Sequence, residues 1–231
     1  MRLAEALEFA SHTHPGMVRA HNEDSLGVAP ELGLAILADG MGGYNAGEVA
    51  SGIAVSLLQA ELRQLLEKTD PSEPHPKTGE MAGVSILREY VLRANTSVYQ
   101  AAQSQPQYAG MGTTLVVTLF CDNRVIVAHI GDSRLYRLRD DMLEQITRDH
   151  SLLQEQLDSG MITREEARVS EHKNLVTRAL GIDSKVEPEI HSYEVKRDDV
   201  YLLCSDGLND MVPDEEIRLS LMTLQSDLKL A

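Results

Sequence analysis

The stretch Leu32–Gly40, LGLAILADG, runs through an almost unbroken series of apolar residues and stops at an aspartate followed by glycine. A short apolar run of this kind, bounded by glycine, predicts a strand that is buried on both faces. The run delivers one carboxylate, that of Asp39, at its C-terminal end. On its own this would be an ordinary strand-to-turn transition, in which Asp and Gly are common.

The same pattern occurs twice more along the chain. The stretch Arg124–Ser133, RVIVAHIGDS, reaches Asp132, and the stretch Val200–Gly207, VYLLCSDG, reaches Asp206. Three apolar strands that each end on a carboxylate predict that the three acids converge at one end of a buried sheet.

Helical and strand patterns fall into separate blocks. Residues 46–66 carry apolar side chains at helical spacing, residues 67–80 form a polar, proline-rich loop, and a second helix is expected from 81 to about 103. From 113 to 146, apolar runs separated by turn signals predict antiparallel meanders. Strands in blocks and helices in pairs favour an α+β layered domain over regular βαβ winding.

Composition limits the class of protein. The chain has 231 residues, 42% of them hydrophobic, which suits one sizeable core and a single domain over residues 1–231. A net charge of −15, from 36 acidic and 21 basic residues, argues against nucleic acid or an anionic membrane as a partner. An anionic substrate would need positive charge to screen it, and bound divalent cations would supply that charge.

The two cysteines, Cys121 and Cys204, each lie in or at the end of an apolar run. This predicts buried thiols in a reducing compartment and not a disulfide framework. The apolar runs are shorter than a membrane span, and the first residues carry Glu5 and Glu8 where a signal peptide would have an apolar core. We expect a cytoplasmic, monomeric protein.

Several phosphate and nucleophile chemistries are excluded by their motifs. The glycine-rich DGMGGYNAG lacks the Gly-Lys-Ser/Thr of a Walker loop, and Asn45 occupies the third glycine of a dinucleotide fingerprint. A cysteine phosphatase needs an arginine six residues after its cysteine, where this chain has Val127 and Asp210. The serine hydrolase pattern G-x-S-x-G is absent.

The chemistry that these exclusions leave is that of a carboxylate site that binds metal ions. The stretch Gly16–Gly27, GMVRAHNEDSLG, adds Glu23 and Asp24 to the acids and places Arg19 just ahead of them. Oxygen-only sites favour Mg²⁺ or Mn²⁺, two of which can bridge and activate a water in line with a phosphorus atom. Arg19 would then bind the phosphate oxygens. The alternatives are a solvated turn, or a salt bridge from Arg19 to Glu23 or Asp24.

Six motifs occur in a familiar order: GMVRAHNEDS, ILADGMGGYNAGEVAS, GMGTTLVV, AHIGDSRLYRLRD, ITRDHS and LLCSDGLNDMV. Together they resemble the bacterial metal-dependent serine/threonine phosphatases of the protein phosphatase 2C (PPM) family, from about residue 14 to 212. The resemblance implies a β-sandwich of two antiparallel sheets flanked by helix pairs, with a binuclear Mg²⁺/Mn²⁺ centre. It also implies hydrolysis of phosphoserine and phosphothreonine in proteins, the partners being a Ser/Thr kinase or its substrates.

The resemblance also implies roles for the metal site. Asp39 corresponds to the carboxylate that bridges both metals, Gly40 to the residue that offers its carbonyl, and Asp206 to a ligand of the other metal. Asp132 is similar to an acid that helps hold a third, weaker cation, and its alternative role is a structural hydrogen bond within its turn.

Further roles concern the surroundings of the metals. Glu23 and Asp24 resemble acids that act through metal-bound waters, and Arg19 resembles the phosphate-binding arginine. Residues 149–181 resemble a variable flap that helps choose substrates. Thr113 and Thr114 match a motif, and we interpret them as packing and β-forming residues.

The chain departs from the family pattern at two places. Tyr44 stands where bacterial members have a histidine that protonates the leaving oxygen; a phenol could donate that proton or merely fill the pocket wall. No Asp-Asn pair of a closing strand follows before Ala231, which predicts a shortened domain or a metal site with one fewer carboxylate, and an exposed sheet edge. The alternative function is a pseudophosphatase that binds phosphoproteins without turnover.

Overall fold

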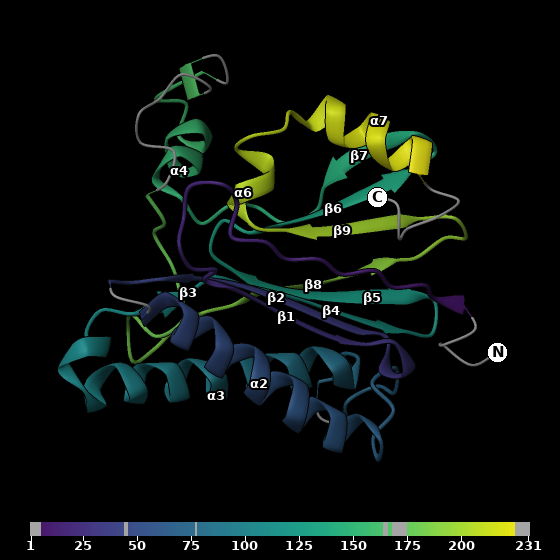
Figure 1. The fold of residues 1–231 in the computed structure, drawn as a ribbon. Coiled ribbons are helices and arrows are strands. Elements are labelled where there is room, and N and C mark those ends of the chain that lie inside the picture. Colours follow the sequence, from purple (N-terminus) through teal and green to yellow (C-terminus); the bar gives the residue numbers. More distant parts are fainter. Residues whose placement is uncertain (1–5, 44–45, 77, 164–165, 168–174, 225–231) are drawn as a thin grey trace.

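The fold consists of two antiparallel sheets stacked face to face, with helices on both outer faces (Figure 1). A computed structural model describes residues 6–43, 46–76, 78–163, 166–167 and 175–224. The predicted α+β architecture, a sandwich of two antiparallel sheets flanked by helices, is confirmed. None of the described helices is both long and apolar enough to cross a bilayer.

The first sheet has the strand order β1-β2-β4-β5-β8, and β3 pairs with the end of β2. Its strands are β1 (Asp24–Ala29), β2 (Leu34–Met41), β3 (Gly112–Thr113), β4 (Leu115–Cys121), β5 (Arg124–Ile130) and β8 (Glu189–Glu194). Strands β4 and β5 are joined by a tight turn, in which Asp122 adopts a φ of 51°.

The second sheet has the order β7-β6-β9, formed by β6 (Arg134–Arg139), β7 (Met142–Gln145) and β9 (Val200–Cys204). The β6–β7 hairpin turns through Asp140 and Asp141, both with positive φ. Aspartate tolerates this left-handed conformation better than most residues, which explains the Asp-Asp pair at the turn.

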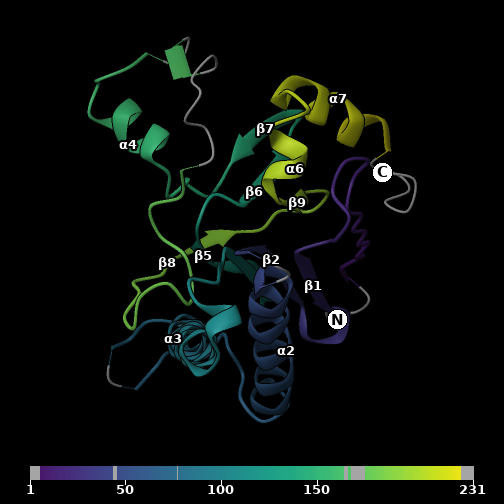
Figure 2. The same cartoon turned by 60° about the vertical axis from the view of Figure 1, so that its left-hand side comes forward.

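The helices cover the outer faces of both sheets. The two predicted helices are α2 (Ala46–Leu66) and α3 (Ala82–Ser104), which lie side by side against the first sheet (Figure 2). Short α6 (Asp206–Asn209) and α7 (Asp214–Leu224) cover the second sheet, where Ile217 and Leu221 pack against Leu138. Helix α4 (Leu152–Asp158) stands away from both sheets (Figure 2).

Strand β4 is buried along its whole length because it lies between two apolar layers. Leu115, Val117 and Leu119 pack into the core under α2 and α3, whereas Val116 and Phe120 pack into the core between the sheets. The alternation follows from the two-residue period of a strand, and it explains why the run is apolar on both faces.

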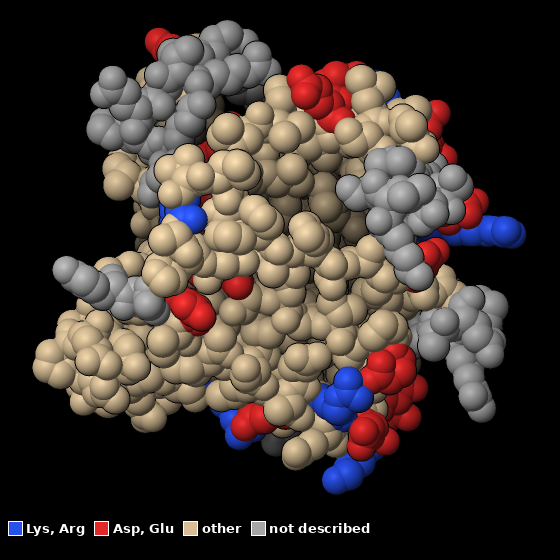
Figure 3. Space-filling model, viewed as in Figure 1, with Lys and Arg blue, Asp and Glu red and all other residues tan. Residues whose placement is uncertain are grey.

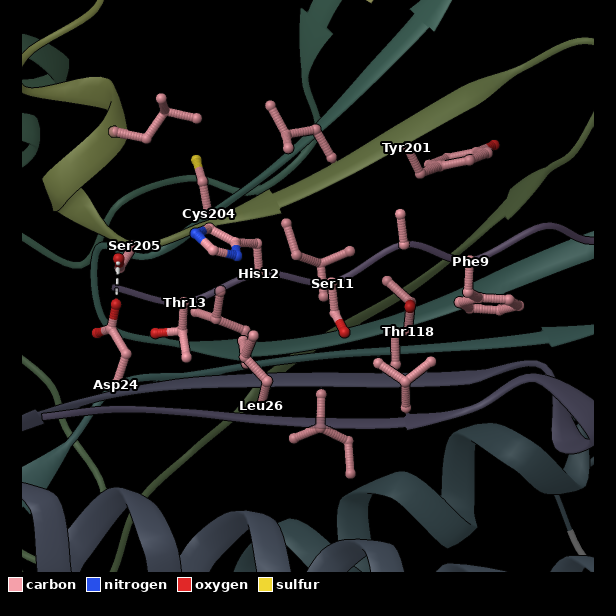
Figure 4. A pocket seen from close by; sticks show the side chains of 18 of the residues that line it. Phe9, Ser11, His12, Thr13, Asp24, Leu26, Thr118, Tyr201, Cys204 and Ser205 are labelled. Atoms are coloured by element: carbon pink, nitrogen blue, oxygen red, sulfur yellow. Dashed lines mark hydrogen bonds between the residues drawn. The ribbon is translucent and has the colours of Figure 1, made fainter. Parts of the chain in front are cut away.

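Strand β9 differs from the prediction that all three Asp-ending runs are buried on both faces. Four of its five residues are only half-buried. The reason is a cleft of about 2960 Å³ that Tyr201 and Leu203 line, together with first-sheet residues such as Leu26. Figure 3 shows this face hollowed between the two layers. In Figure 4 the side chains from Phe9 to Thr13 lie in this cleft, between β9 and the first sheet.

Candidate metal centre

The pairing of β1 with β2 sets the geometry at one end of the cleft. Its register places Asp24 directly opposite Asp39. The connecting turn bends at Gly33, whose φ of +67° suits glycine, and a Cβ there would overlap the backbone of Phe120. The short hairpin therefore fixes two carboxylates side by side where the first sheet meets the cleft.

The other two predicted strand ends arrive at the same place. Asp132 lies in the turn after β5, and Asp206 is the first residue of α6, two residues after the end of β9. Both carboxylates are among the charges that perturb Asp39, so acids from the two sheets share one site. The predicted convergence of Asp39, Asp132 and Asp206 is what the structure shows.

Burial and mutual repulsion make this cluster costly without a cation. Burial, and then the charges of Asp24, Asp206 and Asp132, raises the pKa of Asp39 to about 8. Burial, followed by the charges of Asp206 and Asp149, raises the pKa of Asp132 to about 6. Both raised pKa values mean that ionising these carboxylates together costs free energy.

The donor set fits divalent cations such as Mg²⁺ or Mn²⁺. It consists of carboxylate and backbone oxygens, which hard cations prefer. In the part of the chain that the structure describes, no lysine or arginine pairs with Asp39, Asp132 or Asp206. The charge of the cluster therefore lacks a protein counter-ion at these three positions, and bound cations would supply it.

Two threonines hold Asp39 in place. Its backbone N–H donates to Thr114 Oγ1 over 3.0 Å, and its carbonyl accepts from Thr113 Oγ1 over 2.9 Å and from the Thr114 N–H over 2.8 Å. Thr114 Oγ1 also bonds Ser133 Oγ, next to Asp132, over 2.7 Å. The interpretation of these threonines as packing residues was incomplete, because the Thr114 hydroxyl links the Asp39 backbone to Ser133, the residue after Asp132.

Gly40 is required by close packing. A Cβ at this position would overlap the carbonyl of Gly47 in the first turn of α2. The Gly40 N–H donates to the Glu23 carbonyl over 3.0 Å, and Ser51 Oγ of α2 donates to the same carbonyl over 2.6 Å. These contacts place the Gly40 backbone and Glu23 at the margin of the acid cluster. The predicted use of the Gly40 carbonyl as a ligand stays a prediction.

In the structure Arg19 forms a salt bridge with Glu23, which its sequence position allowed as an alternative to phosphate binding. Its Nη1 lies 3.0 Å from Glu23 Oε2, while 71% of the arginine side chain is exposed to solvent. Both residues line the cleft near Asp24 and Asp39. An exposed ion pair of this kind contributes little stability, which leaves Arg19 free to bind another anion.

Two other residues, Tyr44 and Ser205, bear on the predictions made from the sequence. Tyr44, the candidate proton donor, lies outside the described residues. Ser205, which sequence reasoning did not single out, donates from Oγ to Asp24 Oδ2 over 2.8 Å (Figure 4). Its only sequence signal was its place directly before Asp206.

Comparisons with known proteins give a consistent result. A family model described as protein phosphatase 2C matches residues 10–227. A serine/threonine phosphatase named stp from Listeria innocua is 38% identical over 208 residues, which cover 89% of this chain and 79% of the relative.

Solved structures agree. The chain is similar to the crystal structure of the Mycobacterium tuberculosis serine/threonine phosphatase PstP/Ppp, with a TM-score of 0.78 and 42% identity over 89% of this chain and 81% of that one. A structure of the PstP catalytic domain in complex with two manganese ions gives a TM-score of 0.74 and 42% identity, covering 90% of this chain and 80% of that one.

The raised pKa of Asp39 predicts how the metal-free chain responds to pH. An aspartate ordinarily titrates near 3.8 and folded Asp39 near 8, so the folded state holds the extra proton and stability falls as pH rises between these values. We expect Asp39→Asn to remove this loss and to raise the melting temperature in EDTA at pH 8 by several degrees. Thermal melts from pH 5 to 8.5 measure it.

The control is Asp122→Asn, at an exposed turn position whose positive φ asparagine also accepts. It should leave the pH dependence of the wild type unchanged. A wild-type melting temperature that stays constant from pH 5 to 8.5, or an Asp39→Asn variant less stable than the wild type at pH 8, would contradict the repulsion described above.

Proposed function

Because the chain belongs to the protein phosphatase 2C family, we propose that it is a metal-dependent phosphatase that hydrolyses phosphoserine and phosphothreonine in proteins. The observation that carries this function is the convergence of Asp24, Asp39, Asp132 and Asp206 at the end of a cleft, without a paired lysine or arginine among the described residues at the last three. An all-oxygen acidic site beside an arginine is suited to cations and a phosphate.

Asp39 and Asp206 would hold two Mg²⁺ or Mn²⁺ ions, with the Gly40 carbonyl as a further ligand and Asp132 on a third, weaker ion. When bound, such cations supply an activated water and neutralise phosphate charge. Glu23 and Asp24 support this arrangement from the β1 side, and Ser205 fixes Asp24 by donating to its carboxylate. The hydrogen bonds with Thr113 and Thr114 fix the backbone of Asp39 for this role.

Arg19 would bind the phosphoryl oxygens of the substrate. Its guanidinium presents several N–H donors in a fork that suits phosphate oxygens. Its partner Glu23 orients it toward the cleft, and its exposed position lets a protein substrate reach it.

Tyr44 is the candidate acid for the leaving serine or threonine oxygen. Its support is its position in the sequence, three residues after Met41, whose strand β2 carries Asp39. An alkoxide leaves poorly without a proton, so a donor matters for these substrates.

We assign substrate selection to residues 149–181, within a single phosphatase domain. Leu175 and Val176, near the end of this segment, line the cleft. The protein substrates would be a bacterial Ser/Thr kinase or its targets, acted on by a monomer. The free, buried thiols of Cys121 and Cys204 favour a reducing, cytoplasmic compartment.

Phosphate release from a phosphothreonine peptide tests the function directly. We expect turnover with Mn²⁺ and none with EDTA, and we expect Asp206→Asn to lower kcat/KM by about 100-fold or more. The matched control is Asp140→Asn, at the exposed β6–β7 turn, where asparagine also accepts the positive φ. Peptide binding at saturating Mn²⁺ without turnover would instead favour the pseudophosphatase.

A pair of variants separates the two roles of Arg19. If it binds phosphate, Arg19→Ala should raise KM and lower kcat/KM by about 10- to 100-fold, since a charge-assisted hydrogen bond is lost. Arg19→Lys keeps a cation that can pair with Glu23 but loses the forked N–H donors, so it should also raise KM, by about 3- to 10-fold. A KM that stays at the wild-type value in Arg19→Lys, or in both variants, would reduce Arg19 to a partner of Glu23.

The role of Tyr44 depends on the leaving group. Tyr44→Phe should lower kcat for a phosphoserine peptide by about 10-fold or more, because the alkoxide needs a proton. Hydrolysis of p-nitrophenyl phosphate should change little, since p-nitrophenolate leaves without one. If both substrates lose the same factor, or neither does, Tyr44 only fills the pocket wall.

A further inference from the structure

His129, His150 and Glu189 form a compact group outside the carboxylate cluster. Their candidate ligand atoms all lie within 4.8 Å of one another, and both histidines are buried. The two imidazole rings stack with centroids 4.8 Å apart and planes inclined by 19°. Two histidines and a carboxylate at this spacing have the composition of a zinc site.

The hydrogen bonds account for this group without a metal. Burial lowers the pKa of both imidazoles, so both are neutral at pH 7. His129 Nε2 lies 2.9 Å from the carbonyl of Arg148, which can only accept, so this nitrogen carries the proton. His150 Nδ1 accepts from the Gly131 N–H over 3.1 Å, so its proton is on Nε2, 3.1 Å from Glu189 Oε1. A metal would have to displace both protons.

The bonds of His150 point instead to the carboxylate cluster. Its ring accepts from the Gly131 N–H, and its own N–H donates to the Gly131 carbonyl over 2.9 Å. One residue therefore holds both backbone groups of the glycine that precedes Asp132. Gly131 has a φ of +101°, a conformation that glycine adopts readily and most other residues do not.

The neighbouring residue holds the other side of the same turn. Arg134 Nε and Nη2 donate to both oxygens of Asp149 over 2.7 to 3.1 Å. Gln145 Nε2 also donates to Asp149, over 2.8 Å. Asp149 and His150 thus hold residues on both sides of Asp132.

The backbone of residues 150–152 also bonds residues 175–177, near the end of the flap. The His150 carbonyl accepts from the Thr177 N–H over 2.8 Å, and the Leu152 N–H donates to the Leu175 carbonyl over 2.9 Å. Leu175 lines the cleft in which a substrate would lie. A single buried residue therefore contacts both the Asp132 turn and the returning end of the flap.

We propose that His150 is a positioning residue that, through its Nδ1, holds the Gly131–Asp132 turn in the geometry that binds a cation and ties that turn to residues 175–177 of the flap. This inference rests on the proposed function for its consequence in catalysis, but the contacts themselves do not depend on it. The Nε2 side of the ring, toward Glu189, has no part in this role.

Two substitutions separate the two ring nitrogens. His150→Asn places an amide oxygen where Nδ1 was, so it can still accept from the Gly131 N–H. His150→Gln places its amide near the former Nε2 and leaves the Gly131 N–H without an acceptor. Both variants lose the stack with His129, so both should lose similar stability, and a purely structural role would affect them equally.

The direct measurement is hydrogen exchange at the Gly131 and Thr177 amides, followed by NMR with and without diamagnetic Mg²⁺. We expect the Gly131 amide to stay protected in His150→Asn and to exchange about 10-fold faster in His150→Gln, since one hydrogen bond is lost. Mg²⁺ should slow exchange at Thr177 in the wild type and in His150→Asn, and should not do so in His150→Gln.

Calorimetric titration with Mn²⁺ gives a second result. The weakest class of Mn²⁺ sites should lose about 10-fold in affinity in His150→Gln and stay close to wild type in His150→Asn. Glu189→Gln, which changes only the Nε2 side, should leave both Gly131 protection and Mn²⁺ affinity unchanged. If His150→Gln does not fold, His150→Asn and Glu189→Gln decide alone, because loss of Gly131 protection in either overturns the proposal.

Equal exchange rates at Gly131 in His150→Asn and His150→Gln, or an unchanged Mn²⁺ affinity in His150→Gln, would also overturn it. These readouts are independent of turnover. A chain that shows the expected exchange pattern but hydrolyses no phosphopeptide would refute the proposed function and leave the positioning role in place.

Discussion

The repulsion among four carboxylates at one end of the sandwich is the constraint on which the rest of the site depends. Asp24 and Asp39 come from adjacent strands of the first sheet, Asp132 from the turn after β5, and Asp206 from the end of β9 in the second sheet. The folded chain must hold them together against burial and like charge, as the raised pKa of Asp39 records. A protein tolerates such a cost where function requires it, and two bound cations would turn the repulsion into attraction.

The surroundings supply rigidity where the carboxylates supply charge. Thr113 and Thr114 fix the backbone of Asp39, and Ser133 extends this network to the residue after Asp132. The other side of Asp132 is held through Gly131 by His150. The candidate ligands thus lie at strand ends whose backbone groups bond buried side chains, which is what precise metal geometry requires. In the proposed function, Arg19 and the flap would contact the substrate. Arg19 is exposed, and helix α4 of the flap stands away from both sheets (Figure 2).

The local features of the fold could be predicted from the sequence, because each depends on a short run of neighbouring residues. The helix over 46–66 follows from its apolar spacing, and the carboxylates at Asp39, Asp132 and Asp206 follow from where apolar runs stop. What could not be predicted depends on which distant segments meet. The bond from Ser205 to Asp24 spans 181 residues, and the half-exposure of β9 depends on a cleft that no local pattern encodes. Arg19 had two possible partners at comparable distance in sequence, and only the structure shows it on Glu23.

Calorimetric titration of Mn²⁺ into the EDTA-stripped chain at pH 7.5, compared with the Asp39→Asn variant, tests the central claim most directly. If the four carboxylates form a cation site, the wild type will bind at least two Mn²⁺ ions per chain, and the variant will lose at least one of them or bind it about 10-fold or more weakly. Binding with unchanged stoichiometry and affinity in Asp39→Asn, or no binding by the wild type, would show that the acids converge for another reason.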